Sequence, residues 1–134
     1  MKIIFWKKEL QEILKQYKVW LETGEKEGKR ADFDGMILIW TNLARTDLRR
    51  ANLRNAIFVC ANFTKANLIG ADMSNVNLYL TNFSFADLSG AVLEGAKFNK
   101  WTSLKNANLF CAYRPEGLKG YKINEDGFII IDLN

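Results

Sequence analysis

The sequence predicts a solenoid, in which the chain turns a corner every five residues around one continuous core. Three observations predict this fold: a large apolar residue at every fifth position, a mostly small residue two positions before it, and a recurrent Asn or Asp between the two. A period of five fits neither an α-helix, which repeats every 3.6 residues, nor a strand, which repeats every two. The large residues are Phe33, Leu38, Leu43, Leu48, Leu53, Phe58, Phe63, Leu68, Met73, Leu78, Phe83, Leu88, Leu93 and Phe98.

The corner positions have the residue types that tight turns require. Glycine and asparagine are frequent two positions after the large residue, as at Gly35, Asn55 and Gly70. Both tolerate the positive φ of a type II corner. The Asn/Asp column, which includes Asn62 and Asp72, offers side chains that accept hydrogen bonds from turn backbone. We therefore expect the large and the small residue of each five to point inward and the other three to point outward.

The segments ANLRN, ANFTK, ANLIG, ADMSN and ADLSG resemble the A(D/N)LxX repeats of the pentapeptide-repeat family. The resemblance covers residues 31–112. It implies an all-β solenoid, a right-handed quadrilateral β-helix of about four coils, with twenty residues per coil and residue n stacked on n+20. After Phe98 the register slips by one residue near Trp101, and Leu104 and Leu109 then continue two of the interior columns.

We expect residues 1–134 to form a single domain, with an N-terminal helix over 1–22, a charged linker over 23–30, the repeats over 31–112 and a C-terminal tail over 113–134. The first segment has apolar residues at helical spacing and is interpreted as a cap, because a solenoid must cover its terminal core and strand edges. A membrane-surface helix fits less well, since its polar face mixes Glu with Lys.

The tail carries a hairpin pattern after the only proline of the chain, Pro115. Tyr121–Asn124 and Phe128–Leu133 flank the turn residues Glu125–Gly127, which is typical of a β-hairpin. The second strand is too apolar to lie exposed. It is expected to cap the last coil, to cover a side wall or to pair with another chain.

Composition argues against several functional classes. The chain has no histidine, which excludes Ser-His and Cys-His nucleophiles and His-ligated zinc. Cys60 and Cys111 fall on opposite sides of the predicted coil, which argues against a disulfide and a thiolate metal site and suits a reducing, cytoplasmic location. No apolar run approaches the ~18 residues of a membrane-spanning helix. We therefore expect no enzymatic activity, no cofactor, no metal and no membrane insertion.

One wall of the predicted solenoid is apolar on its outer side. We call it the apolar wall; its outward residues are Ile37, Ile39, Trp40, Ile57, Val59, Cys60, Tyr79 and Leu80. A patch of this size is normally covered or is a binding site. Three candidates could cover the apolar wall: the N-terminal helix, the strand Phe128–Leu133, or a second molecule, either another copy or a different protein. Trp40 and Tyr79 are the expected anchors of an interface, because aromatic residues dominate interface hot spots.

Basic residues cluster on the first coil and form a second candidate surface. Arg45, Arg49, Arg50 and Arg54 lie close together, with Lys65 stacked above Arg45. They could contact an anion or nucleic acid. The alternative is a solvated edge that discourages end-to-end stacking, and the net charge of only +4 favours it.

The sequence thus predicts a non-catalytic, rigid scaffold for protein–protein interactions. A partner protein or self-association would use the apolar wall or the C-terminal strand. Some members of the resembled family protect DNA gyrase by mimicking duplex DNA. That alternative is disfavoured because a DNA mimic should be acidic, whereas residues 31–114 carry nine basic and six acidic residues. Weak nucleic-acid binding through the first-coil arginines is the remaining alternative.

Overall fold

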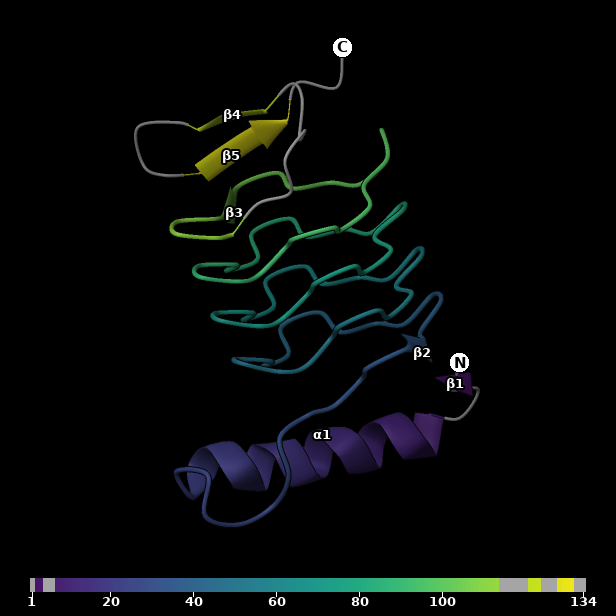
Figure 1. Ribbon diagram of the computed structural model, residues 1–134, viewed down its shortest axis with the longest axis vertical. Coiled ribbons are helices and arrows are strands. Elements are labelled where there is room, and N and C mark those ends of the chain that lie inside the picture. The colour runs from purple at the N-terminus through teal and green to yellow at the C-terminus, as the bar shows by residue number, and fades with distance from the viewer. Residues whose placement is uncertain (1, 4–6, 114–120, 124–127, 132–134) are drawn as a thin grey trace.

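The computed structural model describes residues 2–3, 7–113, 121–123 and 128–131. Stacked coils form the body of the molecule, with a helix across one end and a pair of strands at the other (Figure 1). The elements are β1 (Lys2–Ile3), α1 (Lys7–Glu22), β2 (Met36–Ile37), β3 (Ala107–Asn108), β4 (Tyr121–Ile123) and β5 (Phe128–Ile131).

The coils are joined by parallel bridges between residues twenty positions apart. One column runs from Asp32 to Asn52, then to Asp72 and Val92. Between neighbouring coils, each bridged pentad contributes a single residue, because a corner follows on either side. Most of the β-structure therefore consists of isolated bridges rather than long strands.

A one-residue insertion changes this offset in the fourth coil. Asn82 bridges to Ser103 rather than to residue 102, and later bridges keep the new offset. The insertion is absorbed at Asn99, whose side-chain Oδ1 accepts the Leu80 N–H at 3.1 Å. In the coil below, the equivalent N–H of Cys60 donates to a backbone oxygen, that of Tyr79. The Asn99 side chain thus supplies the acceptor that a backbone oxygen supplies one coil earlier.

The corners are turns closed by the backbone. The Met36 N–H donates to the Phe33 oxygen at 3.0 Å, and the corner residue between them, Gly35, has a φ of 69°. The same conformation recurs at non-glycine corners: Trp40, Arg45, Arg50, Asn55, Cys60, Lys65, Asn75, Leu80, Phe85, Asn106 and Cys111 all have positive φ. Closing a four-sided coil requires this geometry at each of these corners, whichever residue occupies it.

The Asn/Asp column stabilises these turns as the sequence predicts. Asn62 Oδ1 accepts the N–H of Thr64 at 2.9 Å, and Asp72 Oδ1 accepts that of Ser74 at 3.1 Å. In each case a side-chain oxygen satisfies a backbone N–H two residues further on, in an Asx turn. Among the described residues, twelve bind in this way: Asp32, Asn42, Asp47, Asn52, Asn62, Asn67, Asp72, Asn77, Asn82, Asp87, Asn99 and Asn108.

The interior is a stack of the predicted large residues. Phe33 to Leu93 of this series are at most 2% exposed, and Leu104 and Leu109 continue the stack. Aromatic rings meet inside it: Phe63 is stacked on Phe83 with ring centres 5.0 Å apart. Phe98 departs from the expectation and is half-buried, because it lies beside the insertion, where the coil is distorted.

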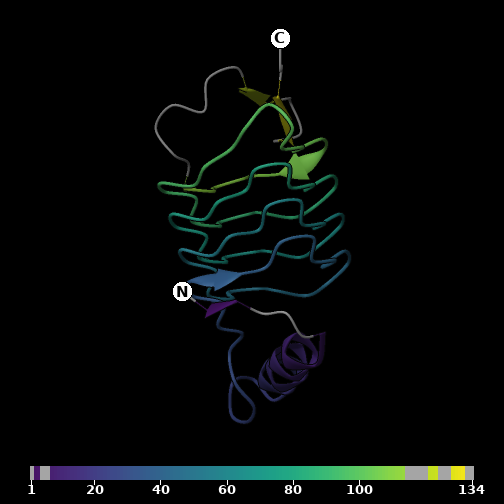
Figure 2. The ribbon, with the colours of Figure 1, turned by 90° about the vertical axis from the view of Figure 1, so that its right-hand side faces the viewer.

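The N-terminal cap differs in detail from the helix expected over residues 1–22. Lys2–Ile3 forms β1, which pairs in parallel with β2 along one side of the first coil. The helix α1 crosses beneath this coil in both views (Figures 1 and 2). Trp20, Leu14 and Leu21 of α1 pack against the core.

The segment after α1 folds back onto the helix. The Thr23 hydroxyl donates to the Val19 oxygen at 2.8 Å and accepts the Glu27 N–H at 3.0 Å. The Lys29 N–H donates to the Gln16 oxygen at 3.1 Å. The expected linker is therefore bonded to the cap rather than extended.

The C-terminal strands close the other end. β5 pairs antiparallel with both β4 and β3, and β3 belongs to the last coil. Residues 124–127 and 132–134, which include the expected turn and the end of the second expected strand, lie outside the described residues.

Candidate functional site

The apolar wall faces outward from the first three coils. Its middle column is joined by bridges from Ile37 to Ile57 and from Ile57 to Asn77. Trp40 is 78% exposed and Leu80 is 44% exposed. Ile39 and Tyr79 are also exposed, whereas Ile37, Ile57, Val59 and Cys60 are half-buried. The structure therefore brings the sequence-predicted interface residues together on one side of the molecule.

Two of these residues have a backbone conformation that bulky side chains rarely adopt. Trp40 has a φ of 61° and Leu80 a φ of 58°. A left-handed conformation costs a residue other than glycine roughly 1 kcal/mol or more. Both side chains are also largely exposed to solvent, so core packing does not offset this cost. The same conformation occurs at Phe85, an exposed aromatic corner of another wall, so it is a property of the coil and does not single out the apolar wall.

Neither intramolecular occupant lies on the apolar wall in the part of the chain that the structure describes. The helix α1 crosses the end of the rod, and β5 pairs with β3 at the opposite end (Figure 1).

The first-coil arginines are mostly engaged in ion pairs. Arg49 Nη2 lies 2.7 Å from Asp47 Oδ2, and Arg54 Nη1 lies 3.2 Å from Asp72 Oδ2. Arg50 pairs with Glu25, and its guanidinium lies 5.1 Å from the ring centre of Trp20. The Arg50 contacts join the cap to the first coil, and the Arg54–Asp72 pair joins two successive coils. Arg45 and Lys65 are exposed and have no ion-pair partner among the described residues.

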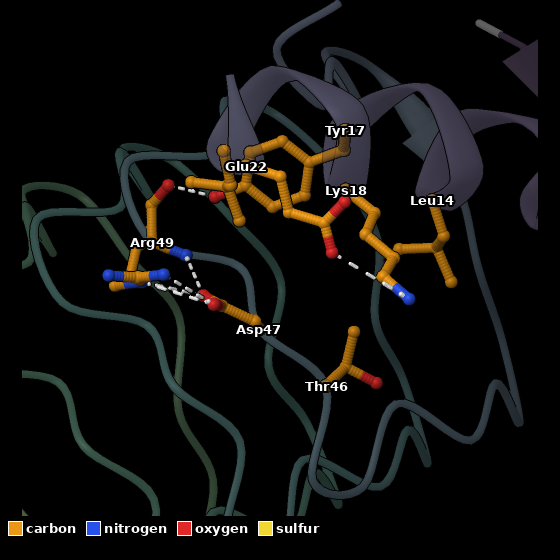
Figure 3. A pocket seen from close by; sticks show the side chains of 8 residues that line it. Leu14, Tyr17, Lys18, Glu22, Thr46, Asp47 and Arg49 are labelled. Atoms are coloured by element: carbon orange, nitrogen blue, oxygen red, sulfur yellow. Dashed lines mark hydrogen bonds and ion pairs between the residues drawn. The ribbon is translucent and has the colours of Figure 1, made fainter. Parts of the chain in front are cut away.

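A cavity of about 490 Å³ lies between α1 and the first coil (Figure 3). It is lined by Leu14, Tyr17, Lys18, Leu21, Glu22, Thr46, Asp47 and Arg49. Its charged groups pair with one another, since Lys18 Nζ lies 3.8 Å from Glu22 Oε1 and Arg49 binds Asp47. The volume lies within the range of small-molecule sites, but balanced charges select no class of ligand, and we assign the cavity none.

Tyr17 anchors the cap at this cavity. Its side chain is buried, and its hydroxyl donates to the Arg49 backbone oxygen (Figure 3). Burial, reinforced by the Asp47 carboxylate, raises the pKa of Tyr17 above its ordinary value. The sequence places Tyr17 on the apolar helix face but contains no signal for its acceptor, because that carbonyl comes from a residue 32 positions away.

The pKa of the neighbouring acid, Asp47, shifts in the opposite direction. Burial disfavours the charged form of Asp47, but hydrogen bonds from the Arg49 side chain and backbone outweigh it and hold the pKa of Asp47 below its ordinary value. Asp47 is therefore ionised at neutral pH and stays paired with Arg49.

We expect Tyr17→Phe to lower the free energy of unfolding by about 1 kcal/mol, because the partly buried hydrogen bond to the Arg49 oxygen is lost. The raised pKa adds a pH dependence. The folded state holds the phenol proton more tightly, so wild-type stability falls as the pH rises above the ordinary value of about 10. Tyr17→Phe should lose this contribution, and urea unfolding at neutral and alkaline pH measures both effects.

Tyr79→Phe is the matched control, because Tyr79 is exposed on the apolar wall. It should change the free energy of unfolding by less than about 0.5 kcal/mol. If Tyr17→Phe loses as much stability at alkaline pH as the wild type does, ionisation of the Tyr17 phenol is not what destabilises the folded state.

The described residues contain no group of three or more Cys, Asp or Glu side chains placed to hold a metal ion. Among them there is also no helix with the length and apolar character needed to cross a membrane.

Comparison with known proteins identifies the repeats. The family described as "Pentapeptide repeats (8 copies)" matches residues 29–59, 37–75, 56–95 and 77–109, which together cover more than half of the chain. No curated protein matches the sequence.

Several solved structures are similar. A pentapeptide repeat protein from Nostoc is 27% identical, with a TM-score of 0.59, and the match covers 78% of this chain and 86% of that one. One from the Arabidopsis thaliana thylakoid lumen is 37% identical, with a TM-score of 0.44; the match covers 60% of this chain and 59% of that protein's length. QnrB1, a plasmid-mediated fluoroquinolone resistance protein, is 16% identical, with a TM-score of 0.37 and coverage of 69% and 63%.

The family match, the twenty-residue register and the interior column of large residues agree with one another. The chain belongs to the pentapeptide-repeat family, whose members form right-handed β-helices.

Proposed function

We propose that this protein is a non-catalytic binding module that docks a protein on its apolar wall. The observation that carries the proposal is the exposure of Trp40, at 78%, within a patch that α1 and β5 leave open. Aromatic anchors surrounded by apolar side chains are typical of interface hot spots. The regular backbone pairing of the coils supports a rigid docking surface that loses little entropy on binding.

The charge distribution favours a protein partner over nucleic acid. Residues 36–40, 56–60 and 76–80 contain no charged side chain. Nucleic-acid surfaces depend on unpaired cations, whereas Arg49, Arg50 and Arg54 are paired. The net charge of residues 31–114 is positive, which also argues against a DNA mimic. We place the protein in the cytoplasm, a location supported by its two free cysteines, Cys60 and Cys111.

Capture of proteins from the source cells tests docking by comparing three immobilised forms. Wild type and Phe85→Glu should retain the same proteins, and Trp40→Glu should lose them. Phe85 is the matched control because it too is an exposed aromatic residue at a positive-φ corner, but of a different wall. Identical capture by all three forms would contradict docking on the apolar wall.

A further inference from the structure

Among the described walls, the apolar wall is the one whose first three coils carry no charge. Each of the other walls has charged outward residues, such as Asp34 and Arg54 on one, Arg45 and Lys65 on the next, and Asp47 on the last. Burying a charge without a partner is costly. A surface that packs on the apolar wall must therefore be uncharged and apolar itself, and a second copy of the same wall meets that requirement.

We propose that the apolar wall binds the apolar wall of a second copy, with the two rods antiparallel. This inference rests on the proposed docking function and names its occupant. A face-to-face pair with two-fold symmetry has two possible arrangements, with the rods parallel or antiparallel. The distribution of side chains on the wall distinguishes them.

The corner residues favour the antiparallel arrangement. Trp40, Cys60 and Leu80 form one corner column of the wall, and Gly35, Asn55 and Asn75 form the other. Antiparallel rods centred on the second coil place each corner column on its own counterpart. Trp40 then meets Leu80 of the second copy, and the two Cys60 residues meet each other. Parallel rods would instead place Trp40 on the column of Gly35 and Asn55.

The lysines at the far end of the wall favour the same arrangement. Lys97 and Lys100 lie on the fourth coil of this wall, where both are exposed. Parallel rods would place these lysines opposite those of the second copy, and like charges directly opposite each other are destabilising. Antiparallel rods centred on the second coil place the two lysine pairs at opposite ends of the dimer, each at the level of β1 of the second copy, which pairs with β2.

The patch also sets the expected strength of the pair. Three coils span about 10 Å along the rod, and their outward side chains are partly buried already. The contact is smaller than the ~800 Å² per partner of a standard interface. We therefore expect a reversible dimer with a dissociation constant in the micromolar range.

Sedimentation equilibrium over a range of concentrations tests the pair. Wild type should pass from the 15.4 kDa chain to a dimer. Trp40→Glu should raise the dissociation constant at least about 30-fold, as expected for a hot-spot residue, and Phe85→Glu should leave it unchanged. Circular dichroism checks that each variant is folded. A folded wild type that stays monomeric at ~100 µM, well above the micromolar range, would overturn the proposal.

Cross-linking tests the antiparallel register. In a Cys111→Ser background, a short bismaleimide should join Cys60 to Cys60 in the dimer. The matched control carries Cys60→Ser and Lys65→Cys as well, because residue 65 is an exposed corner of the same coil on a different wall. That control should not cross-link. A dimer without the Cys60 product, or with equal yields in both forms, would overturn the antiparallel register.

A charge exchange gives an independent test. Two double variants are compared, Trp40→Glu/Leu80→Glu and Trp40→Arg/Leu80→Arg. Each should be monomeric on its own, because like charges would meet across the interface. When mixed, they should form a heterodimer, since each glutamate then faces an arginine. If mixing does not restore the dimer, Trp40 and Leu80 do not face each other.

The outcomes also separate self-pairing from docking of another protein. A monomer whose protein capture still depends on Trp40 would overturn self-pairing and leave the docking proposal intact. A dimer that captures no protein through Trp40 would show that the wall serves self-association alone.

Discussion

Replacing Phe83 by alanine should lower the free energy of unfolding by about 3–5 kcal/mol, the range for loss of a buried aromatic side chain. Phe83 is fully buried, and its ring is stacked on Phe63, whose own ring meets that of Phe58 edge-on at 5.0 Å. The substitution leaves a cavity inside a stack in which each coil depends on its neighbours. Urea unfolding monitored by circular dichroism measures the loss.

Phe85→Ala is the matched control for this prediction. Phe85 lies two residues further along the same wall but is 54% exposed. The same change of side chain should therefore alter the free energy of unfolding by less than about 0.5 kcal/mol. Equal losses in the two variants would contradict the division of each pentad into inward and outward residues.

Gly28→Ala should release the N-terminal cap and lower the free energy of unfolding by about 2–4 kcal/mol, from a left-handed backbone and overpacking combined. Gly28 has a φ of 72° and lies against α1. An added Cβ would be 2.3 Å from the Gln16 backbone oxygen and 2.8 Å from the Trp20 backbone nitrogen. These atoms belong to the helix backbone and cannot turn away. The helix must therefore shift from the segment that holds it.

Gly24→Ala separates the clash from the backbone strain. Gly24 has a φ of 60°, and an added Cβ there would have no atom within 4 Å. Its cost should stay at about 1–2 kcal/mol, from the left-handed conformation alone. Limited proteolysis of α1 is the second measurement, since only Gly28→Ala should expose the helix to cleavage. Equal stability and equal cleavage in both variants would show that Gly28 does not hold the cap.

The period of five predicts a chain that turns a corner every five residues, and the resemblance to the pentapeptide-repeat family implies the twenty-residue coil. It places the large residues inside and the Asn/Asp column in the turns, and the break in the period places the slip near Trp101. The apolar wall follows from the same rule, because a twenty-residue coil assigns every outward residue to a side. Repetition makes such predictions strong, since one correct register places every repeat.

The ends of the chain lack this repetition, and the sequence left their positions open. The apolar residues of α1 are compatible both with covering the first coil and with lying along the apolar wall. The position of α1 across the end of the first coil depends on contacts between residues far apart in the sequence. These are the Tyr17 hydroxyl on the Arg49 oxygen, Arg50 over Trp20, and Lys2–Ile3 beside Met36–Ile37. None of these partners is related by the period.

The sequence, with the twenty-residue coil that its family resemblance implies, therefore determined the interior and the outward chemistry of each wall, because one register assigns every residue to a side. Only the tertiary structure decided which surfaces stay open. It placed the helix and the C-terminal strands on the two ends of the rod, where strand edges need hydrogen-bond partners. On the apolar wall the Leu38 and Trp40 N–H groups already donate to the next coil, so the exposed side chains are the main groups that a partner would bind.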